Sequence, residues 1–169
     1  MVSLLLLLSS VVVAQIPDES SLRTFDGGFP FTTRYPSALV VETGASDEGI
    51  SATFSETAGA EASIHVRFYS RPMPKVAEVR SLVTSKDGLL DYDGWTLRER
   101  STDVARQYPW AVERLEFVAT KQSQRGYIGD VVIGKYKRAG FYVITFYPAV
   151  DRERWQAYQQ TIFAHFRLN

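Results

Sequence analysis

The stretch YIGDVVIGKY-KRAG-FYVITFYPAV, residues Tyr127 to Val150, decides the fold. Two runs rich in β-branched and aromatic residues flank a short loop with a glycine, which is typical of an antiparallel hairpin. Successive residues of a strand point to opposite faces of the sheet. One face of the second arm therefore carries Tyr142, Ile144 and Phe146, and the other carries Phe141, Val143, Thr145 and Tyr147. Both faces are mostly apolar, so we place the hairpin in mid-sheet with a layer packed on each side.

The rest of the chain supplies further strands and two helices. Short runs that alternate apolar and polar residues predict strands near residues 31–36, 39–42, 50–54, 64–68, 95–100 and 108–119. After Pro74 the apolar period changes from two to about 3.6, and one helical stripe would hold Val76, Val79, Leu82 and Val83. The order strands, helix, strands, helix predicts an α+β fold with an antiparallel β-sheet sandwiched between helices.

The last predicted element is a helix that follows Asp151, a residue type suited to the N-cap position. Val150 and Trp155 occupy the two positions of a hydrophobic staple. One face of this helix carries Trp155, Tyr158, Ile162 and Phe166. We expect that face to pack on the sheet.

Residues Val2 to Ala14 form an apolar run that would span only about two thirds of a bilayer core as a helix. The run fits the apolar region of a secretory signal, with a small residue, Ala14, at the expected cleavage position. No Lys or Arg precedes it, so an uncleaved anchor or a buried strand are the alternative interpretations. We expect a signal peptide at 1–14, a polar tether at 15–28 and one domain at 29–169. Such a chain would be secreted to the periplasm or a thylakoid lumen, with no membrane span once the signal is removed.

The composition excludes several classes of function. Nineteen basic residues balance nineteen acidic ones, so no net field would attract nucleic acid. The chain has no cysteine, which excludes disulfides, thiol catalysis and cysteine-bound zinc. The serines and glycines form neither a G-x-S-x-G motif nor a phosphate-binding loop.

Two groups of residues are candidates for a metal or proton-transfer site. His65 and His165 lack the spacing of a metal motif, and packing roles are favoured. Asp87 and the run Asp91-Tyr92-Asp93-Gly94 offer oxygen ligands for Ca²⁺, but the later ligand positions of an EF-hand loop are missing, which favours an ordinary turn. The sequence therefore predicts a protein that binds no metal and no cofactor and is not an enzyme.

Aromatic residues make up 13% of the chain and are the remaining functional signal. Six of them lie near predicted strand ends or loops: Tyr69, Tyr92, Tyr108, Trp110, Tyr127 and Tyr136. They are candidates for lining a pocket or a surface that binds a partner. The alternative, which the sequence favours, is that they cap the core of the sheet through amphipathic packing.

The run Phe31-x-x-x-Tyr35-Pro36-Ser37, followed by an apolar strand at Leu39-Val40-Val41, resembles the opening motif of the PsbP-like superfamily. The hairpin and the closing helix that ends near Phe166-Arg167 resemble the end of that family. The resemblance implies an α/β/α sandwich around an antiparallel sheet. It also implies mostly noncatalytic relatives, among them lumenal subunits of photosystem II, and it assigns no site residue.

The leading hypothesis is thus a noncatalytic, exported domain that docks to a protein partner, such as the extracytoplasmic face of a photosystem or another membrane complex. One alternative is a carrier of small apolar ligands in the periplasm or lumen, with a pocket between the sheet and a helix. Another is a hydrolase or other enzyme whose site is assembled from dispersed Asp, Glu and His residues.

Overall fold

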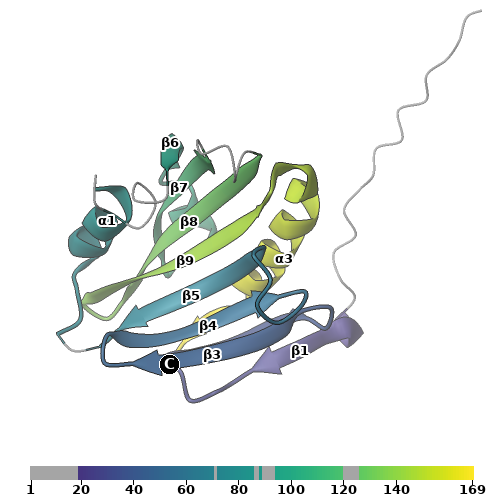
Figure 1. Cartoon of the computed structure of the whole chain (residues 1–169). Helices are drawn as coiled ribbons and strands as arrows, with labels where there is room; N and C mark the ends of the chain where they lie inside the picture. The colour runs from purple at the N-terminus through teal and green to yellow at the C-terminus, as the bar shows by residue number, and fades with distance from the viewer. Residues whose placement is uncertain (1–18, 71, 86–87, 89–93, 120–125) are drawn as a thin grey trace, which may run out of the picture.

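The computed structural model of the chain describes residues 19–70, 72–85, 88, 94–119 and 126–169 (Figure 1). A seven-stranded antiparallel sheet has the strand order β3-β4-β5-β9-β8-β7-β6. Its strands are β3 (Val40–Ser46), β4 (Gly49–Ser55), β5 (Ser63–Tyr69), β6 (Trp95–Ser101), β7 (Ala111–Ala119), β8 (Tyr127–Tyr136) and β9 (Ala139–Pro148). A smaller sheet, in the order β1-β2-β10, consists of β1 (Leu22–Phe25), β2 (Phe31–Pro36) and β10 (Arg167–Leu168).

The helical elements are η1 (Glu19–Ser21), α1 (Val76–Thr84), α2 (Val104–Gln107), η3 (Ala149–Asp151) and α3 (Arg152–His165). The short helix α2 falls within a stretch for which the sequence predicted no helix. Strand β1 lies inside the segment 15–28 that was expected to be a tether, and it pairs with β2 from Leu22 to Phe25. The folded part of the chain therefore includes residues on both sides of the expected boundary.

The hairpin at Tyr127 to Val150 lies inside the large sheet, as predicted. Strands β8 and β9 pair along their whole length, and β9 also pairs with β5. The turn between them has two residues, because Tyr136 is paired with Ala139. Lys137, the first turn residue, has a positive φ of 55°, a conformation that is unfavourable for a residue with a side chain.

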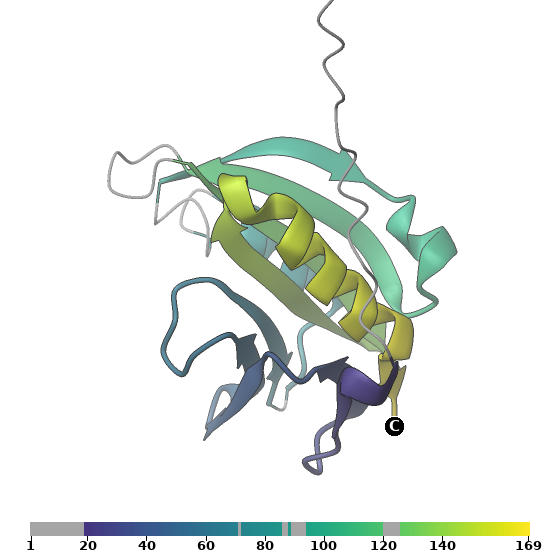
Figure 2. The same cartoon turned by 90° about the vertical axis from the view of Figure 1, so that its right-hand side faces the viewer.

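Both faces of the hairpin are covered, as its two apolar faces require (Figures 1 and 2). Helix α3 and the small sheet cover one face, which we call the α3 face, and Phe141, Val143 and Tyr147 point to it. Helix α1 covers part of the other, the α1 face, to which Tyr142, Ile144 and Phe146 point. The α+β sandwich expected from the sequence is thus confirmed.

Four stacked phenylalanines hold the layers of the α3 face together. Phe31 of β2 lies 4.7 Å from Phe166 and 5.7 Å from Phe68, between ring centroids. Phe141 of β9 completes the set, 4.4 Å from Phe68 and 5.9 Å from Phe166. The rings are nearly parallel, with interplanar angles of 12° and 13°. One aromatic stack therefore joins the small sheet, the large sheet and the end of α3.

Helix α1 packs closely on β9 because residue 140 is a glycine. Gly140 N donates a hydrogen bond to Pro74 O, 2.7 Å away, just before the helix. A Cβ at position 140 would lie 2.9 Å from Cα of Val76 and 2.7 Å from Cγ2 of Val79. The helix buries Val79 and Val83, as its apolar stripe predicted, but leaves Leu82 48% exposed.

The expected staple at the start of α3 is wrong. Val150 is 93% exposed and cannot pack against the buried Trp155. The chain enters α3 through the 3-10 turn η3, which directs Val150 outward, so the N′ residue is not extended as a staple requires. Asp151 does precede the helix, but its side chain makes no cap hydrogen bond and instead pairs with Arg154 at 3.1 Å.

Candidate functional site

An open groove of about 680 Å³ lies where the end of α3 meets the loop after α2. It is lined by Gln107, Tyr108, Pro109, Trp110, Lys135, Phe163, Ala164, Phe166, Arg167 and Leu168. The indole of Trp110 is at the centre of its aromatic wall, 5.0 Å from the ring of Phe163 and 4.7 Å from that of Phe166. Tyr108 stacks on Trp110 at 5.9 Å. Trp110, Phe163 and Phe166 are 7%, 3% and 1% exposed, so they form a nearly buried wall, and Tyr108 is the more exposed ring of the groove.

The loop after α2 positions these two aromatic residues. Tyr108 N donates to Val104 O and closes the last turn of α2. Pro109 lacks an N–H group and cannot extend the helix. Ala111 N then donates to Tyr108 O, and Lys135 N donates to Trp110 O at 2.8 Å. Backbone hydrogen bonds thus fix the aromatic wall against β8.

Trp110 carries an unused hydrogen-bond donor. Its side chain is only 7% exposed, and its buried Nε1 has no hydrogen-bond partner in the described part of the chain. Leaving such a donor unpaired costs about 1 to 3 kcal/mol. Burial also raises the pKa of the neighbouring Tyr108 above its usual value.

Cations surround the hairpin end of the groove. Lys135 and Arg167 line it, and no Asp or Glu is among its lining residues. Lys137 and Arg138 form the adjacent turn of the hairpin, and all four cations are exposed. We call these four residues the basic rim. None of them forms an ion pair with a residue that the structure describes.

Local contacts hold the basic rim in place. Arg167 Nη1 donates to the carbonyl oxygens of Ala164 and Phe166. Tyr136 Oη donates to Asn169 O at 2.7 Å, which ties the last residues to the hairpin. The ammonium group of Lys137 lies 4.7 Å from the centroid of the Tyr136 ring, within reach of a cation–π interaction. The two segments of the rim are thus joined to each other.

A polar cleft of about 290 Å³ continues the groove along α3. It shares Gln107, Tyr108 and Phe163 with the groove. Its other lining residues are Ser101, Asp103, Val104, Arg114, Val132, Gln156, Gln159 and Gln160. Gln159 donates through Nε2 to Thr145 Oγ1 at 2.7 Å. The cleft therefore differs from the groove in having three further glutamines, together with the charged side chains of Asp103 and Arg114.

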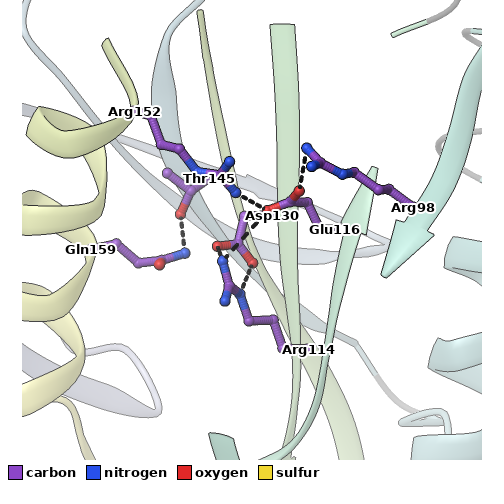
Figure 3. Close-up of polar contacts among 7 residues, drawn as sticks. All are labelled: Arg98, Arg114, Glu116, Asp130, Thr145, Arg152 and Gln159. Carbon is purple, nitrogen blue, oxygen red and sulfur yellow. Dashed lines mark hydrogen bonds and ion pairs between the residues drawn. The ribbon is translucent and has the colours of Figure 1, made fainter. Parts of the chain in front are cut away.

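A buried ion-pair network lies next to this cleft, on the α3 face of the sheet (Figure 3). Arg114 donates through Nε and Nη2 to the two carboxylate oxygens of Asp130, at 2.8 and 2.7 Å. Asp130 is fully buried in the middle of β8. Glu116 is also buried and pairs with Arg98 of β6 and with Arg152 at the start of α3. The network thus connects α3 to three strands.

The ion-pair network of Asp130 and Glu116 has the chemistry of a structural contact that holds α3 to the sheet. Arginine stays protonated in proteins, so none of these cations can act as a general acid or base. Both carboxylates already accept bonds from guanidinium groups. The hydroxyl of Tyr147 is buried beside them without a partner among the described residues, and burial, followed by the charge of Asp130, raises the pKa of Tyr147.

A third buried carboxylate anchors the opposite layer. Glu113 of β7 accepts a hydrogen bond from Arg80 of α1 and another, at 2.7 Å, from Arg100 of β6. Glu113 is 2% exposed, whereas Arg80 and Arg100 are 37% and 53% exposed, so the carboxylate is buried and its two partners reach the solvent. Each face of β7 therefore carries one carboxylate that holds a helix to the sheet.

The structure brings together only some of the aromatic residues that the sequence selected. Tyr108 and Trp110 line the groove, and Tyr136 lies beside it, packed on Phe68. Tyr69 and Tyr127 lie on the α1 face instead, against Tyr142 and Phe146 respectively. Tyr127 also donates to Glu61 Oε2 at 3.2 Å. Tyr92 lies outside the described residues.

Several residues of the groove were not among the site residues predicted from the sequence, including Phe163, Phe166, Lys135 and Arg167. The first two belong to the buried side of α3 and its end, and their local pattern indicates only a core role. Asp130 had a clearer signal, because it interrupts the apolar run from Ile128 to Ile133. An acidic residue inside such a strand needs a buried partner, and that partner is Arg114.

The two histidines lie on different elements and make separate contacts. The His65 Nδ1 atom is 2.8 Å from the Thr53 hydroxyl, and burial, then the charge of Arg67, lowers the pKa of His65. The His165 Nδ1 atom is 2.9 Å from Thr161 O within α3. Among the described residues no group of three His, Cys, Asp or Glu is placed to hold a metal. Asp87 and the run 91–93 lie outside them.

In the described segments, no helix has both the length and the apolar character needed to cross a membrane. No protein-family model matches the chain. No curated protein matches it either.

Solved structures similar to this chain include the following two. One is the solution structure of cyanobacterial PsbP (CyanoP) from Synechocystis sp. PCC 6803, with a TM-score of 0.57 and 12% identity over 95% of this chain and 96% of that one. The other is a crystal structure of a protein from Bacteroides thetaiotaomicron VPI-5482, with a TM-score of 0.53 and 12% identity. That match covers 88% of this chain and 49% of the other, so the chain spans about half its length. These likenesses show a PsbP-like fold.

Proposed function

We propose that this chain with a PsbP-like fold is a noncatalytic domain that docks to a protein partner through the groove and the basic rim. The observation that supports this most is the open aromatic groove, in which Tyr108 and Trp110 lie beside Lys135 and Arg167. Tyr, Trp and Arg are the residue types most enriched at the energetic centres of protein interfaces. The rim cations have no ion-pair partner among the described residues, which leaves them available to a partner.

The state of the buried carboxylates supports a noncatalytic role. A general acid or base must be able to exchange a proton with a substrate. Glu113, Glu116 and Asp130 are each bonded to arginine inside the fold. They serve to hold layers together, so the enzyme assembled from dispersed acids is the weakest of the three hypotheses.

The proposed location is extracytoplasmic, in a periplasm or a thylakoid lumen. It rests on the interpretation of residues 1–14 as a signal peptide and on the likeness to a cyanobacterial PsbP. The proposed partner is a membrane complex whose extracytoplasmic face would receive the groove, with a photosystem as the example that the PsbP-like resemblance suggests.

A carrier of small apolar ligands is the second candidate. The groove, at about 680 Å³, has the size of a small-molecule site, and its wall of Trp110, Phe163 and Phe166 is apolar. A carrier would bind a lipid-like molecule with an affinity that does not depend on the basic rim. A docking domain would lose its partner when the rim is altered.

The test is a pull-down with the tagged protein from solubilised membranes of its native host, analysed by quantitative mass spectrometry. We expect one membrane complex to be enriched with the wild type and reduced at least about fivefold with the double variant Lys135→Glu/Arg167→Glu, because interface charges steer association. Lys75→Glu makes the same kind of charge change beside α1, outside the groove and rim, and should retain the complex. Equal recovery with all three proteins, or no enriched complex, would contradict docking through this surface.

A further inference from the structure

We infer that the groove and the polar cleft bind one extended, acidic peptide segment of the partner, which inserts an aromatic or large aliphatic side chain beside Trp110. This inference rests on the proposed docking function and specifies its chemistry. It follows from the continuity of the two depressions, the kinds of side chain that line each of them, and the charge at one end.

The two depressions form a continuous surface along α3. They share Gln107, Tyr108 and Phe163, and their linings on the α3 side run from Gln156 to Leu168. The helical part of that path, up to His165, is about 14 Å long at 1.5 Å per residue, which an extended peptide covers with about four residues. A short segment of chain therefore fits the length of the surface.

The groove supplies the anchor position. Its aromatic wall has Phe163 and Trp110 edge to face at 88° and Phe166 4.7 Å from the same indole. These three rings are 1% to 7% exposed, so a flat or branched apolar side chain placed there would cover the remaining exposed edges of the wall and lose its own contact with water, which is how dominant interface residues are stabilised.

The cleft suits a peptide backbone. Gln156 and Gln160 line it from α3, beside the buried Gln159 whose Nε2 is already bonded to Thr145, and Gln107 lines it from the end of α2. A primary amide both donates and accepts hydrogen bonds, so it can pair with the N–H and C=O groups of an extended chain. An entirely apolar ligand would use none of these amides. The cleft thus favours a peptide over a lipid-like molecule.

The basic rim sets the charge of the segment. Lys135, Lys137, Arg138 and Arg167 lie at the hairpin end of the groove, and no acidic residue lines that groove. The one acidic residue in the lining of the cleft, Asp103, is paired with Arg106. The whole chain carries a formal net charge of zero, so the rim is a local feature and not part of a generally basic surface. Asp or Glu residues next to the anchor would pair with these cations.

The test begins with a random 12-residue peptide library displayed on phage and selected on the purified protein. We expect the selected peptides to carry Trp, Phe, Tyr or Leu adjacent to two or more acidic residues. One such peptide, synthesised with a fluorescent label, should lose at least about tenfold in affinity with Lys135→Glu/Arg167→Glu and in high salt. It should keep its affinity with Lys75→Glu. Its binding should shift the NMR signal of the Trp110 indole N–H.

Other outcomes would overturn the inference. Peptides without acidic residues, or peptides whose affinity is unchanged by the charge reversals, would show that the rim does not select the segment. If the protein binds phosphatidylglycerol vesicles but no selected peptide, the basic rim binds a lipid surface. If a fatty acid binds in the groove and competes there with the selected peptide, the groove is the site of a carrier. If no acidic consensus emerges while the pull-down still depends on Lys135 and Arg167, the docking function stands and this peptide chemistry is wrong.

Discussion

The phenyl ring of Phe141 lies over Gly134, its cross-strand partner in the central hairpin. A Cβ on residue 134 would be 2.8 Å or less from three carbons of that ring. The ring has little room to move, because it stacks on Phe68 at 4.4 Å and lies 5.7 Å from Trp110. Because residue 134 has no side chain, the ring of Phe141 fits into the aromatic stack and packs against Trp110 of the groove wall.

Gly134→Ala should accordingly destabilise the protein by about 1 to 3 kcal/mol, the usual cost of overpacking a core. Urea denaturation followed by tryptophan fluorescence would measure the loss. Gly129→Ala in the same strand is the matched control, because its Cβ would meet Trp95 and Phe117 at 3.6 to 3.8 Å, which are ordinary contacts. The control should be neutral or slightly stabilising, and an equal loss in both variants would contradict the explanation.

Gly140→Ala should loosen helix α1 and leave α3 in place. The new methyl group would collide with the backbone of Val76 and with Val79. We expect amide hydrogen exchange in α1 to become at least about tenfold faster, which corresponds to a local loss of about 1.4 kcal/mol. Exchange in α3 serves as the internal reference. Uniform acceleration in both helices would indicate global destabilisation instead.

Removing the buried carboxylate of Asp130 should be more costly than removing the whole pair. Asp130→Ala leaves the guanidinium of Arg114 without its partner, and breaking such a buried pair costs about 3 to 5 kcal/mol. Because Arg114 is one-third exposed, we expect a value near the lower end. The double variant Asp130→Ala/Arg114→Ala should recover part of the loss. Additive effects in urea denaturation would show that the two residues are not coupled.

Tyr142 should make stability fall at alkaline pH. Burial raises the pKa of Tyr142 to about 12, with a smaller contribution from Tyr69, while an unfolded tyrosine titrates near 10. Between these values the unfolded chain releases the proton first, so unfolding becomes easier as pH rises from about 10 to 12, by about 2 to 3 kcal/mol in total.

The phenylalanine variant isolates this effect. Tyr142→Phe keeps the ring contacts and removes the titrating group. The difference in unfolding free energy between wild type and variant should be constant below pH 10 and should shift in favour of the variant above it. A difference that stays constant up to pH 12 would show that Tyr142 titrates normally.

Much of the fold was predictable because the decisive strand is unusual. Apolar residues on both faces of Phe141 to Tyr147 leave few options other than a covered mid-sheet strand. The start of α3 was harder, since the staple pattern at Val150 and Trp155 is local, whereas the 3-10 turn that directs Val150 outward depends on how β9 ends. Strand β1 has only four residues, two of them exposed and charged or polar, so its sequence gives no periodic signal.

The groove was predictable only in part. Tyr108 and Trp110 stood out as aromatic residues near a strand end, but Lys135, Phe163 and Arg167 come from distant segments with ordinary local roles. Only the packing of β8, the α2 loop and the end of α3 brings them together. The same packing sends Tyr69 and Tyr127 to the opposite face, because the alternation of strand side chains decides which surface each one reaches.

The stack of Phe31, Phe68, Phe141 and Phe166 has a consequence for when the chain can fold. Its members come from β2, β5, β9 and the residue that follows α3, so the α3 face stays incomplete until residue 166 has left the ribosome. Contacts between such distant positions slow folding, to milliseconds or seconds in domains that they dominate. The packing of the α3 face is therefore completed only after synthesis of the last residues. For a protein that we propose to be exported, this delay would keep the nascent chain open long enough to be threaded across a membrane.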